Sequence, residues 1–245
     1  MLRVTRDVTN NMNLNGKRAL VTGGAVRIGR AITDALLAEG AEVIVHFRNS
    51  EKEADTFWPN IIQADLSDPA QCETLLERAS QQFGPIDILV NNAAVFHQTK
   101  LADATYDAVM KELQPNLLAP LALTRGFARQ TKTGRIVNLL DRRITSHDTT
   151  CIPYMLSKKG LEELTKLAAL DLAPGITVNA VAPGAILPPP KDSDNPAWEY
   201  AGTIPLGKRP SPADVASAVL YLLKSDHITG QTIFVDGGQN LLGEK

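Results

Sequence analysis

Short apolar segments alternate with segments of helical periodicity along nearly all of this 245-residue chain. Successive parallel strands are joined by crossovers that are usually helices, so the alternation predicts an α/β fold with a parallel sheet and helices on both faces. The seven segments that we expect to form strands are residues 17–22, 43–45, 61–66, 86–90, 135–140, 176–181 and 232–235. Strands covered on both faces predict a doubly wound arrangement.

Apolar residues recur at helical spacing between several of these strands. We expect helices at residues 28–36, 117–128, 157–172 and 212–223. Gly40 can end the first helix in a left-handed conformation, and Ser211 followed by Pro212 favours the start of the last. The segment near residues 185–208 lacks a clear period, so we expect a loop there that contacts substrate.

Composition indicates one domain and argues against several classes of partner. We expect residues 1–16 to form a flexible tail and residues 17–245 to form a single domain, since continuous α/β domains often reach this size. The formal net charge of −2, with both signs interspersed, argues against nucleic acid and anionic membranes. No apolar run approaches the roughly 20 residues that cross a bilayer, and the opening segment is too polar for a secretory signal.

Cysteine and histidine usage gives no indication of a disulfide framework or a metal site. Cys72 and Cys151 are too few and too far apart for either, so we expect buried thiols in a reducing cytoplasm. The four histidines are His46, His97, His147 and His227. Their neighbours lack ligand spacing, so we expect surface or packing roles and no metal.

A glycine-rich turn between the first strand and the first helix is a candidate phosphate site. Its sequence is Thr22-Gly23-Gly24-Ala25-Val26-Arg27-Ile28-Gly29. Glycines in such a turn let backbone N–H groups approach a pyrophosphate at the N-terminus of the following helix, although a plain glycine turn is the alternative. Arg27 replaces a middle glycine, and its guanidinium can meet phosphate directly or lie at the surface.

The end of the second strand indicates which dinucleotide is bound. An NAD site commonly places a carboxylate there for the ribose hydroxyls, whereas this chain has Arg48, Asn49 and Ser50. A cation and a hydroxyl suit the additional 2′-phosphate of NADP. Glu51 and Glu53 lie slightly beyond and count against this interpretation. We expect the cofactor to be NADP(H).

Tyr154 and Lys158 stand four residues apart at the start of an amphipathic segment, and Asp141 ends an apolar segment upstream. On a helix this spacing places the phenol and the ammonium on one face, where the cation can make the phenol a stronger acid. Such an arrangement suits the transfer of one proton. The same spacing also occurs on ordinary solvated helices.

Several motifs occur together in the order found in one enzyme family. They are the glycine turn, Asn91-Asn92-Ala93-Ala94, Asn116, the Tyr154 and Lys158 pair, and Pro183-Gly184. On these residues the chain resembles the short-chain dehydrogenase/reductase family, from Lys17 to its last residue. The resemblance implies a Rossmann-like sheet of seven parallel strands, a small-molecule substrate and a homotetramer.

The resemblance also implies the residues that contact the cofactor. They are Gly23, Arg27, Ile28, Gly29, Asp65, Leu66, Asn92, Ala93, Ala94, Tyr154, Lys158, Pro183, Gly184 and Ile186. Asp65 and Leu66 match the positions that contact adenine. Asn116 matches the position that holds a water-linked proton path to Lys158.

Asp141 stands where most members of that family have a serine. A serine hydroxyl can donate a hydrogen bond to a ketone oxygen, but an ionised carboxylate only accepts. Asp141 therefore suits a ketone poorly, and it can accept either from a donor-rich heterocycle or from the Tyr154 hydroxyl. Burial can instead keep Asp141 protonated, which would restore its capacity to donate.

Asp141, Arg27 and Phe96 together resemble the pteridine reductase and dihydromonapterin reductase branch of the family. That resemblance implies a pterin ring sandwiched between the nicotinamide and Phe96. We further expect Arg27 to grip the ring and Trp198 and Tyr200 to close over it. Simple core packing is the other interpretation of Phe96. The chain departs from the branch at Ala94, often a serine there, and in the run of three prolines in its substrate loop.

We therefore expect an NADPH-dependent reductase that transfers a hydride to a C=N bond of a dihydropterin or folate-like ring. Tyr154 would donate the proton, Lys158 would lower the phenol pKa and hold the nicotinamide ribose, and Asp141 would orient Tyr154. The alternatives are a 3-oxoacyl or other ketone reductase, a redox sensor that binds NADP(H) without catalysis, and a dehydrogenase that oxidises a sugar or alcohol.

Overall fold

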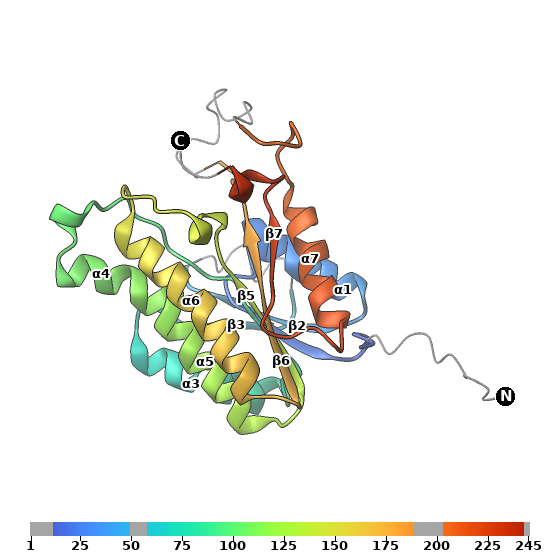
Figure 1. Cartoon of the computed structure of the whole chain (residues 1–245). Helices are drawn as coiled ribbons and strands as arrows, with labels where there is room; N and C mark the ends of the chain where they lie inside the picture. Colours follow the sequence, from blue (N-terminus) through green and yellow to red (C-terminus); the bar gives the residue numbers. More distant parts are fainter. Residues whose placement is uncertain (1–11, 50–57, 189–202, 243–245) are drawn as a thin grey trace.

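A seven-stranded sheet forms the centre of the computed structural model, which describes residues 12–49, 58–188 and 203–242 (Figure 1). All of its strand pairs are parallel, in the order β3-β2-β1-β4-β5-β6-β7. The strands are β1 Arg18–Val21, β2 Glu42–Phe47, β3 Ile61–Gln63, β4 Ile88–Asn91, β5 Gly134–Leu139, β6 Ile176–Pro183 and β7 Thr232–Val235. The predicted doubly wound fold is confirmed, with the third strand ending earlier than expected.

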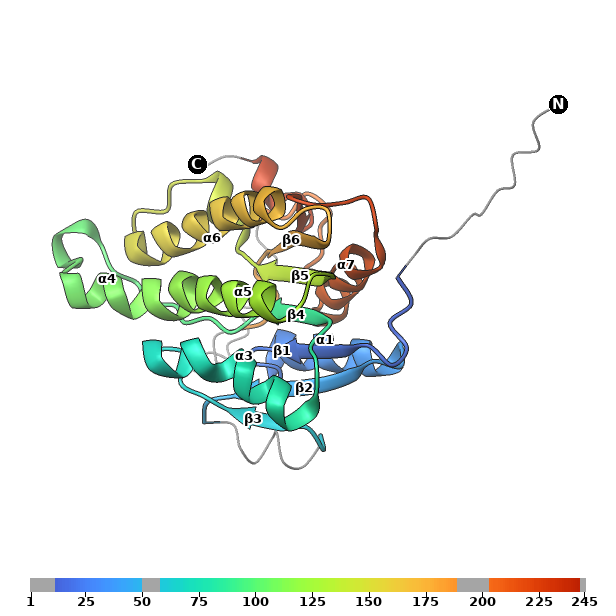
Figure 2. The same cartoon turned by 90° about the horizontal axis from the view of Figure 1, so that it is seen from below.

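Helices cover both faces of this sheet, as the view from below makes plain (Figure 2). The longer helices are α1 Arg27–Ala38, α3 Pro69–Phe83, α4 Tyr106–Leu113, α5 Ala119–Gln130, α6 Ile152–Asp171 and α7 Pro212–Lys224. Helices α1 and α7 pack together on one face, and α3, α5 and α6 lie on the other. Within the described residues, no helix combines the length and the apolar character that crossing a bilayer requires.

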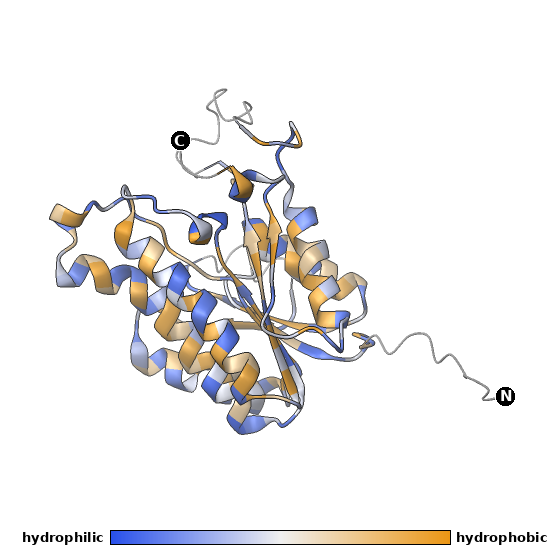
Figure 3. Ribbon diagram, in the orientation of Figure 1, coloured by the Kyte–Doolittle hydropathy of each residue, from blue (hydrophilic) through white to orange (hydrophobic). Residues whose placement is uncertain are grey.

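The strands are buried on both faces because their side chains alternate between two apolar clusters. In β1, Ala19 and Val21 pack with α1 and α7, whereas Leu20 packs with α3 and α5. Figure 3 shows apolar strands in the interior and helices with one polar side. As expected, Cys72 and Cys151 are buried free thiols.

Local signals explain where several helices begin and end. Gly40 takes the left-handed conformation expected of it, with φ of 81°, and Ser211 forms a capping box with Asp214. The expected helix at 117–128 is the last part of a longer helical run. That run comprises α4, the π-helical turn η2 Gln114–Leu118 and α5.

Helices α3 and α4 were not anticipated, although α3 has an N-cap, Asp68, followed by a proline at the first helical position. Helix α6 begins five residues earlier than the predicted 157, at Ile152, so Tyr154 and Lys158 both lie within it. The strand order reverses direction between β1 and β4. In sheets of this type a crevice opens at that point, beyond the carboxyl ends of the strands.

Candidate active site

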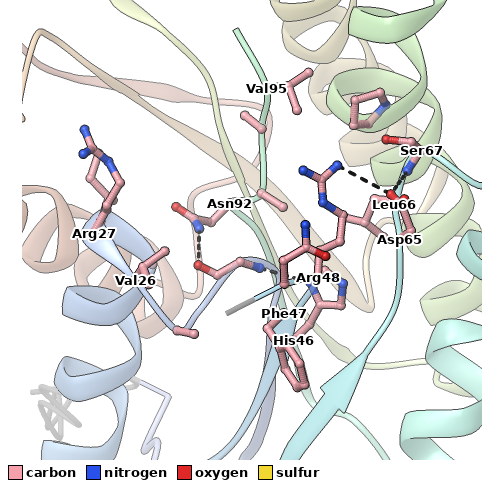
Figure 4. Close-up of a pocket in the computed structure, with 18 residues that line it drawn as sticks. Val26, Arg27, His46, Phe47, Arg48, Asp65, Leu66, Ser67, Asn92 and Val95 are labelled. Carbon is pink, nitrogen blue, oxygen red and sulfur yellow. Dashed lines mark hydrogen bonds and ion pairs between the residues drawn. The ribbon is translucent and has the colours of Figure 1, made fainter. Parts of the chain in front are cut away.

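A pocket of about 420 Å³ lies beyond the carboxyl ends of β1 to β4 (Figure 4). The predicted cofactor residues that line it are Gly23, Arg27, Ile28, Gly29, Arg48, Asn49, Asp65, Leu66, Asn92, Ala93 and Ala94. They come from the ends of four strands, which the parallel sheet brings to one edge. The pocket also has lining residues that the motifs did not indicate: Ala25, Val26, His46, Phe47, Ser67, Val95 and Pro115.

The remaining predicted cofactor residues lie elsewhere. Tyr154, Lys158, Pro183, Gly184 and Ile186 are not part of the lining of this pocket. Three predicted site residues, Ser50, Trp198 and Tyr200, fall outside the described part of the chain, as does most of the predicted substrate loop.

The glycine turn is held tightly between β1 and β4. The side-chain amide of Asn92 donates hydrogen bonds to the carbonyl oxygens of Thr22 (2.8 Å) and Gly23 (3.2 Å). A Cβ added at Gly29 would collide with the Gly23 carbonyl oxygen and with this amide. Gly29 is therefore required by close packing of backbone against backbone, which keeps the start of α1 near the pocket.

His46, near the end of β2, is hydrogen-bonded to the same glycine turn. Its Nδ1 accepts a hydrogen bond from the Gly23 N–H (3.1 Å), and its Nε2 lies 3.0 Å from the Ala64 carbonyl oxygen, to which it donates. Burial lowers the pKa of His46 to about 4, so the ring stays neutral and this tautomer is maintained. The packing role predicted for this histidine is thus a polar one, joining β1, β2 and the end of β3.

Arg27 has a positive φ of 55°, in the left-handed region where the middle glycine of such turns would be unstrained. Its guanidinium donates to the carbonyl oxygen of Pro188 (2.8 Å) and more weakly to that of Leu187 (3.4 Å). Arg27 therefore links the glycine turn to the segment that follows β6. In Figure 4 it lies on the opposite side of the pocket from Arg48.

Arg48 follows β2 and lies 3.8 Å from the Asp65 carboxylate, with both side chains about half exposed. Exposed ion pairs of this kind contribute about 0–1 kcal/mol, so the pair does not commit the guanidinium to its neighbour. Arg48 remains available to an anionic group in the pocket.

Asp141, Tyr154 and Lys158 lie together beyond β5. The Tyr154 hydroxyl donates to Asp141 Oδ2 (2.9 Å), and Lys158 Nζ donates to the Leu139 carbonyl oxygen (2.8 Å). Lys158 is only 2% exposed, and burial lowers its pKa to about 8. The four-residue spacing within α6 thus puts the phenol and the ammonium on one face of the helix, as predicted, and that face lies beside the end of β5.

Arg143 fixes the charge of Asp141, and no sequence motif indicated it. Its Nε and Nη2 donate to the two carboxylate oxygens at 3.0 and 2.9 Å, and its backbone N–H donates at 2.9 Å. Burial raises the pKa of Asp141, but these bonds and the Arg143 charge outweigh it, so the pKa is lowered overall. Asp141 is therefore ionised, and the protonated alternative is not supported.

The pKa of the Tyr154 phenol is raised well above its ordinary value, first by burial and then by the neighbouring Asp141 charge. The overall shift is therefore opposite to the lowering that we expected from Lys158, whose own contribution stays a prediction. Lys158 Nζ lies 5.9 Å from the centroid of the phenol ring, whereas the carboxylate is in direct contact with the hydroxyl. A phenolate there would be placed beside a negative charge.

Phe96 is not a core residue, since 47% of it is exposed. Its ring meets the Tyr154 ring edge to face, with centroids 4.9 Å apart. The Arg143 guanidinium lies 5.0 Å from the Phe96 centroid. A half-exposed aromatic ring therefore adjoins the phenol, and the core-packing interpretation is wrong.

Asn116 lies in the π-helical turn η2 and is completely buried. Its Oδ1 accepts from the Val95 N–H (2.9 Å), and its Nδ2 donates to the Val95 carbonyl oxygen, to Glu112 and to Ser157. The side chain thus connects the segment after β4 with α4 and α6. Its predicted role in a water-linked proton path stays a prediction.

Pro183 ends β6, and the Gly184 N–H donates to the Val235 carbonyl oxygen of β7 (2.9 Å). A Cβ on Gly184 would crowd the Asp236 side chain, so a larger residue would push this segment outward. Ile186 is buried. Among the described residues, no group of three or more acidic, histidine or cysteine side chains could hold a metal ion.

A family model described as enoyl-(acyl carrier protein) reductase matches residues 24–240, which is most of the chain. The chain belongs to the short-chain dehydrogenase/reductase family. The oxidoreductase YhxC of Bacillus subtilis is one of its relatives. It is 33% identical over 92% of this chain and 85% of its own length.

Two further relatives have names that state different activities. The 3-oxoacyl-[acyl-carrier-protein] reductase FabG of Staphylococcus aureus strain Mu50 is 33% identical over 91% of this chain and 97% of its own length. The crystal structure of FolM, alternative dihydrofolate reductase 1, from Brucella canis complexed with NADP matches with a TM-score of 0.89 and 31% identity. That match covers 95% of this chain and 97% of the Brucella chain.

Proposed function

We propose that this short-chain dehydrogenase/reductase uses NADPH to reduce a C=N bond of a dihydropterin or folate-like ring. The ionised Asp141 beside Tyr154 carries the proposal. A carboxylate repels a ketone oxygen but accepts hydrogen bonds from the amino and ring N–H groups that pterins present. The similarity to the Brucella dihydrofolate reductase supports the same substrate class.

The residues around the pocket fit NADP(H). Backbone N–H groups at the start of α1 can hold a pyrophosphate, and Gly29 lets this end of the helix pack against the glycine turn beside the pocket. Arg48 and Asn49 supply a cation and an amide for a 2′-phosphate, where an NAD site would have a carboxylate. When bound, the cofactor supplies the hydride.

In the proposed mechanism, Tyr154 donates the proton. Its raised pKa keeps the phenol protonated at neutral pH, so it enters the reaction as a loaded acid. Asp141 fixes the hydroxyl and accepts from the ring, while Arg143 holds Asp141 in place. Phe96 offers a face for stacking, and Lys158 holds the ribose and returns the proton.

The 3-oxoacyl reductase reaction is the second candidate, favoured by the similarity to FabG. A substrate panel separates the two: NADPH absorbance is followed with dihydropterins, dihydrofolate, quinones and acetoacetyl thioesters. We expect the pterins and dihydrofolate to have the highest kcat/KM. Consumption of oxo compounds alone would overturn the proposal.

A matched variant tests the residue that carries the proposal. We expect Asp141→Ser to lower kcat/KM for dihydropterins at least about tenfold, because a hydrogen bond to a charged group is worth about 1.5–3 kcal/mol. The same variant should gain activity on acetoacetyl thioesters. Equal kcat/KM values for wild type and variant on both substrates would remove Asp141 from substrate selection.

We further propose, from family resemblance alone, that the enzyme is a homotetramer of single-domain chains in the cytoplasm. Its partners would then be small molecules rather than nucleic acid or membrane.

A further inference from the structure

A second cavity, of about 570 Å³, lies outside the cofactor pocket and has mainly polar walls. They are formed by the 3₁₀ turn η3 Arg142–Thr145 after β5, by the loop that follows it, and by the turn η6 Gln239–Leu241. The two turns are in contact, and the Thr145 hydroxyl lies between them. It is 3.1 Å from the Arg142 carbonyl oxygen and 3.5 Å from that of Asn240. The proposed mechanism uses none of this cavity except Arg143.

Two arginines of η3 line the cavity, and only one of them is bound by carboxylates. Arg143 is held by Asp141 and, at 3.1 Å, by Asp148. Both oxygens of Asp148 are engaged, one by Arg143 and the other by Thr150. The partly buried Arg142 side chain, in contrast, has no hydrogen bond or ion pair to any residue that the structure describes. The cavity therefore holds a cation that is available to a ligand.

Arg143 connects this cavity to the candidate substrate site. The same guanidinium that lines the cavity lies 5.0 Å from the Phe96 ring centroid and 5.3 Å from that of Tyr154. A ring stacked on Phe96 would thus contact a side chain that also lines the cavity. A substituent of that ring can therefore extend past Arg143 toward Arg142.

The charges around the site indicate which substituent fits. The ionised Asp141 disfavours an anionic group close to the ring, whereas Arg142 attracts one further along the tail. A surface cavity of about 750 Å³ also reaches Phe96, but it shares Arg48 with the cofactor pocket. An anion there would lie near the 2′-phosphate that we assign to Arg48. The cavity at Arg142 has no such conflict.

We propose that the cavity between η3 and η6 binds an anionic group on the tail of the substrate, and that Arg142 selects for it. The carboxylates of a folate-like conjugate and a phosphate on a pterin side chain share this chemistry, because a guanidinium can bind either through paired N–H donors. Arg142 would then favour a charged tail over a neutral tail on the same ring. The inference rests on the proposed reduction of a pterin-like ring and names the part of the substrate beyond that ring.

The test compares Arg142→Ala with wild type on substrates whose tails differ in charge. Dihydrofolate and dihydroneopterin phosphate have charged tails, and dihydrobiopterin and dihydroneopterin have neutral ones. We expect kcat/KM for the charged substrates to fall about five- to tenfold, between the effects of an exposed ion pair and of a buried hydrogen bond to a charge. The change should lie in KM, because the tail is bound alike in the ground state and the transition state. The values for the neutral substrates should not change.

Two further variants control for charge and for loss of an arginine. Arg142→Lys keeps the charge without the paired donors and should restore part of the lost kcat/KM. Arg129→Ala removes an exposed arginine in the last turn of α5 and should behave as wild type. A loss confined to dihydrofolate would assign the site to carboxylates, and one confined to the phosphate ester would assign it to phosphate. Either result supports an anion site.

Three outcomes would overturn the anion site while the proposed reductase stands. They are an equal loss on charged and neutral substrates, no loss on the charged ones, and a wild-type enzyme that reduces only the neutral ones. A wild-type protein that reduces none of these compounds would overturn the proposed function, and this inference with it.

Discussion

Arg143 sets the charge of Asp141 and therefore determines which hydrogen-bonding groups Asp141 can bind. Without the guanidinium, burial would favour a neutral Asp141, which can donate a hydrogen bond to a carbonyl oxygen. With the guanidinium bound to both carboxylate oxygens, Asp141 is an acceptor only. A second carboxylate, Asp148, binds the same guanidinium (3.1 Å) and holds it under the Phe96 and Tyr154 rings. One side chain therefore fixes both the charge and the shape of the candidate substrate site.

Replacement of the phenol tests the proton donor. Tyr154→Phe keeps the ring that packs against Phe96 but removes the hydroxyl, so we expect turnover to fall by about 10²- to 10⁴-fold, the usual contribution of general acid catalysis. We expect the Kd for NADPH, measured by fluorescence titration, to stay within about twofold of the wild-type value, because the substitution leaves the pocket intact. Near-normal turnover would show that another group delivers the proton.

Replacement of Arg48 tests cofactor choice. Arg48→Asp puts a carboxylate where NAD sites commonly have one, and it repels a 2′-phosphate, so preference should shift from NADPH toward NADH. We expect a change in the ratio of kcat/KM for the two cofactors of at least about tenfold, which corresponds to about 1.4 kcal/mol. An unchanged ratio would mean that Arg48 does not contact the phosphate.

At the scale of elements, the site is assembled from loops at one edge of the sheet. The glycine turn after β1 is bonded from one side by Asn92 after β4 and from the other by His46 of β2. Helix α6 brings the phenol to the end of β5, and η2 ties α4 to α6 through Asn116. Each loop is fixed by polar contacts to its neighbours, so the pocket is largely formed before a ligand enters.

The glycine turn gives a prediction at this scale. Gly29→Ala would drive a methyl group into the Gly23 carbonyl oxygen, which is backbone and cannot rotate away. We expect the turn to shift and the Kd for NADPH to rise at least about tenfold. Gly126→Ala is the control, since its Cβ would meet only the Leu76 side chain in α3. Equal Kd values for NADPH in the two variants would mean that the glycine turn accommodates the methyl group without loss of cofactor binding.

Across the whole molecule, apolar periodicity predicted the sheet well because parallel strands are buried on both faces and appear as short apolar runs. Motif spacing placed Tyr154 and Lys158 correctly, since four residues is one turn of α6. Motif spacing could not predict the contacts between segments that are distant in the sequence. The contact of Glu112 with His97 joins residues 15 positions apart, and nothing in either segment marks the pairing. Spacing also does not show that Arg143 turns back onto Asp141.

Burial of Lys158 affects the stability of the entire fold. Its pKa is about 8 in the folded protein, lowered by burial, against about 10.4 in an unfolded chain. Between these values the unfolded state binds more protons, so the free energy of unfolding should rise with pH from about 8 to about 10.4. Below about pH 8 the buried ammonium costs stability on the order of 3 kcal/mol, since each unit of pKa shift corresponds to about 1.4 kcal/mol.

Lys158→Met tests this cost. Methionine fills a similar volume without a charge, although it leaves the Leu139 carbonyl without its donor, so part of the gain is offset. We expect the free energy of unfolding at about pH 7, from urea titration, to increase by up to about 2 kcal/mol, the burial cost less about 1–3 kcal/mol for the unpaired carbonyl. The rise with pH above about 8 should also disappear, while turnover is lost. A variant no more stable than wild type, with the same pH dependence, would mean that the ammonium is not desolvated.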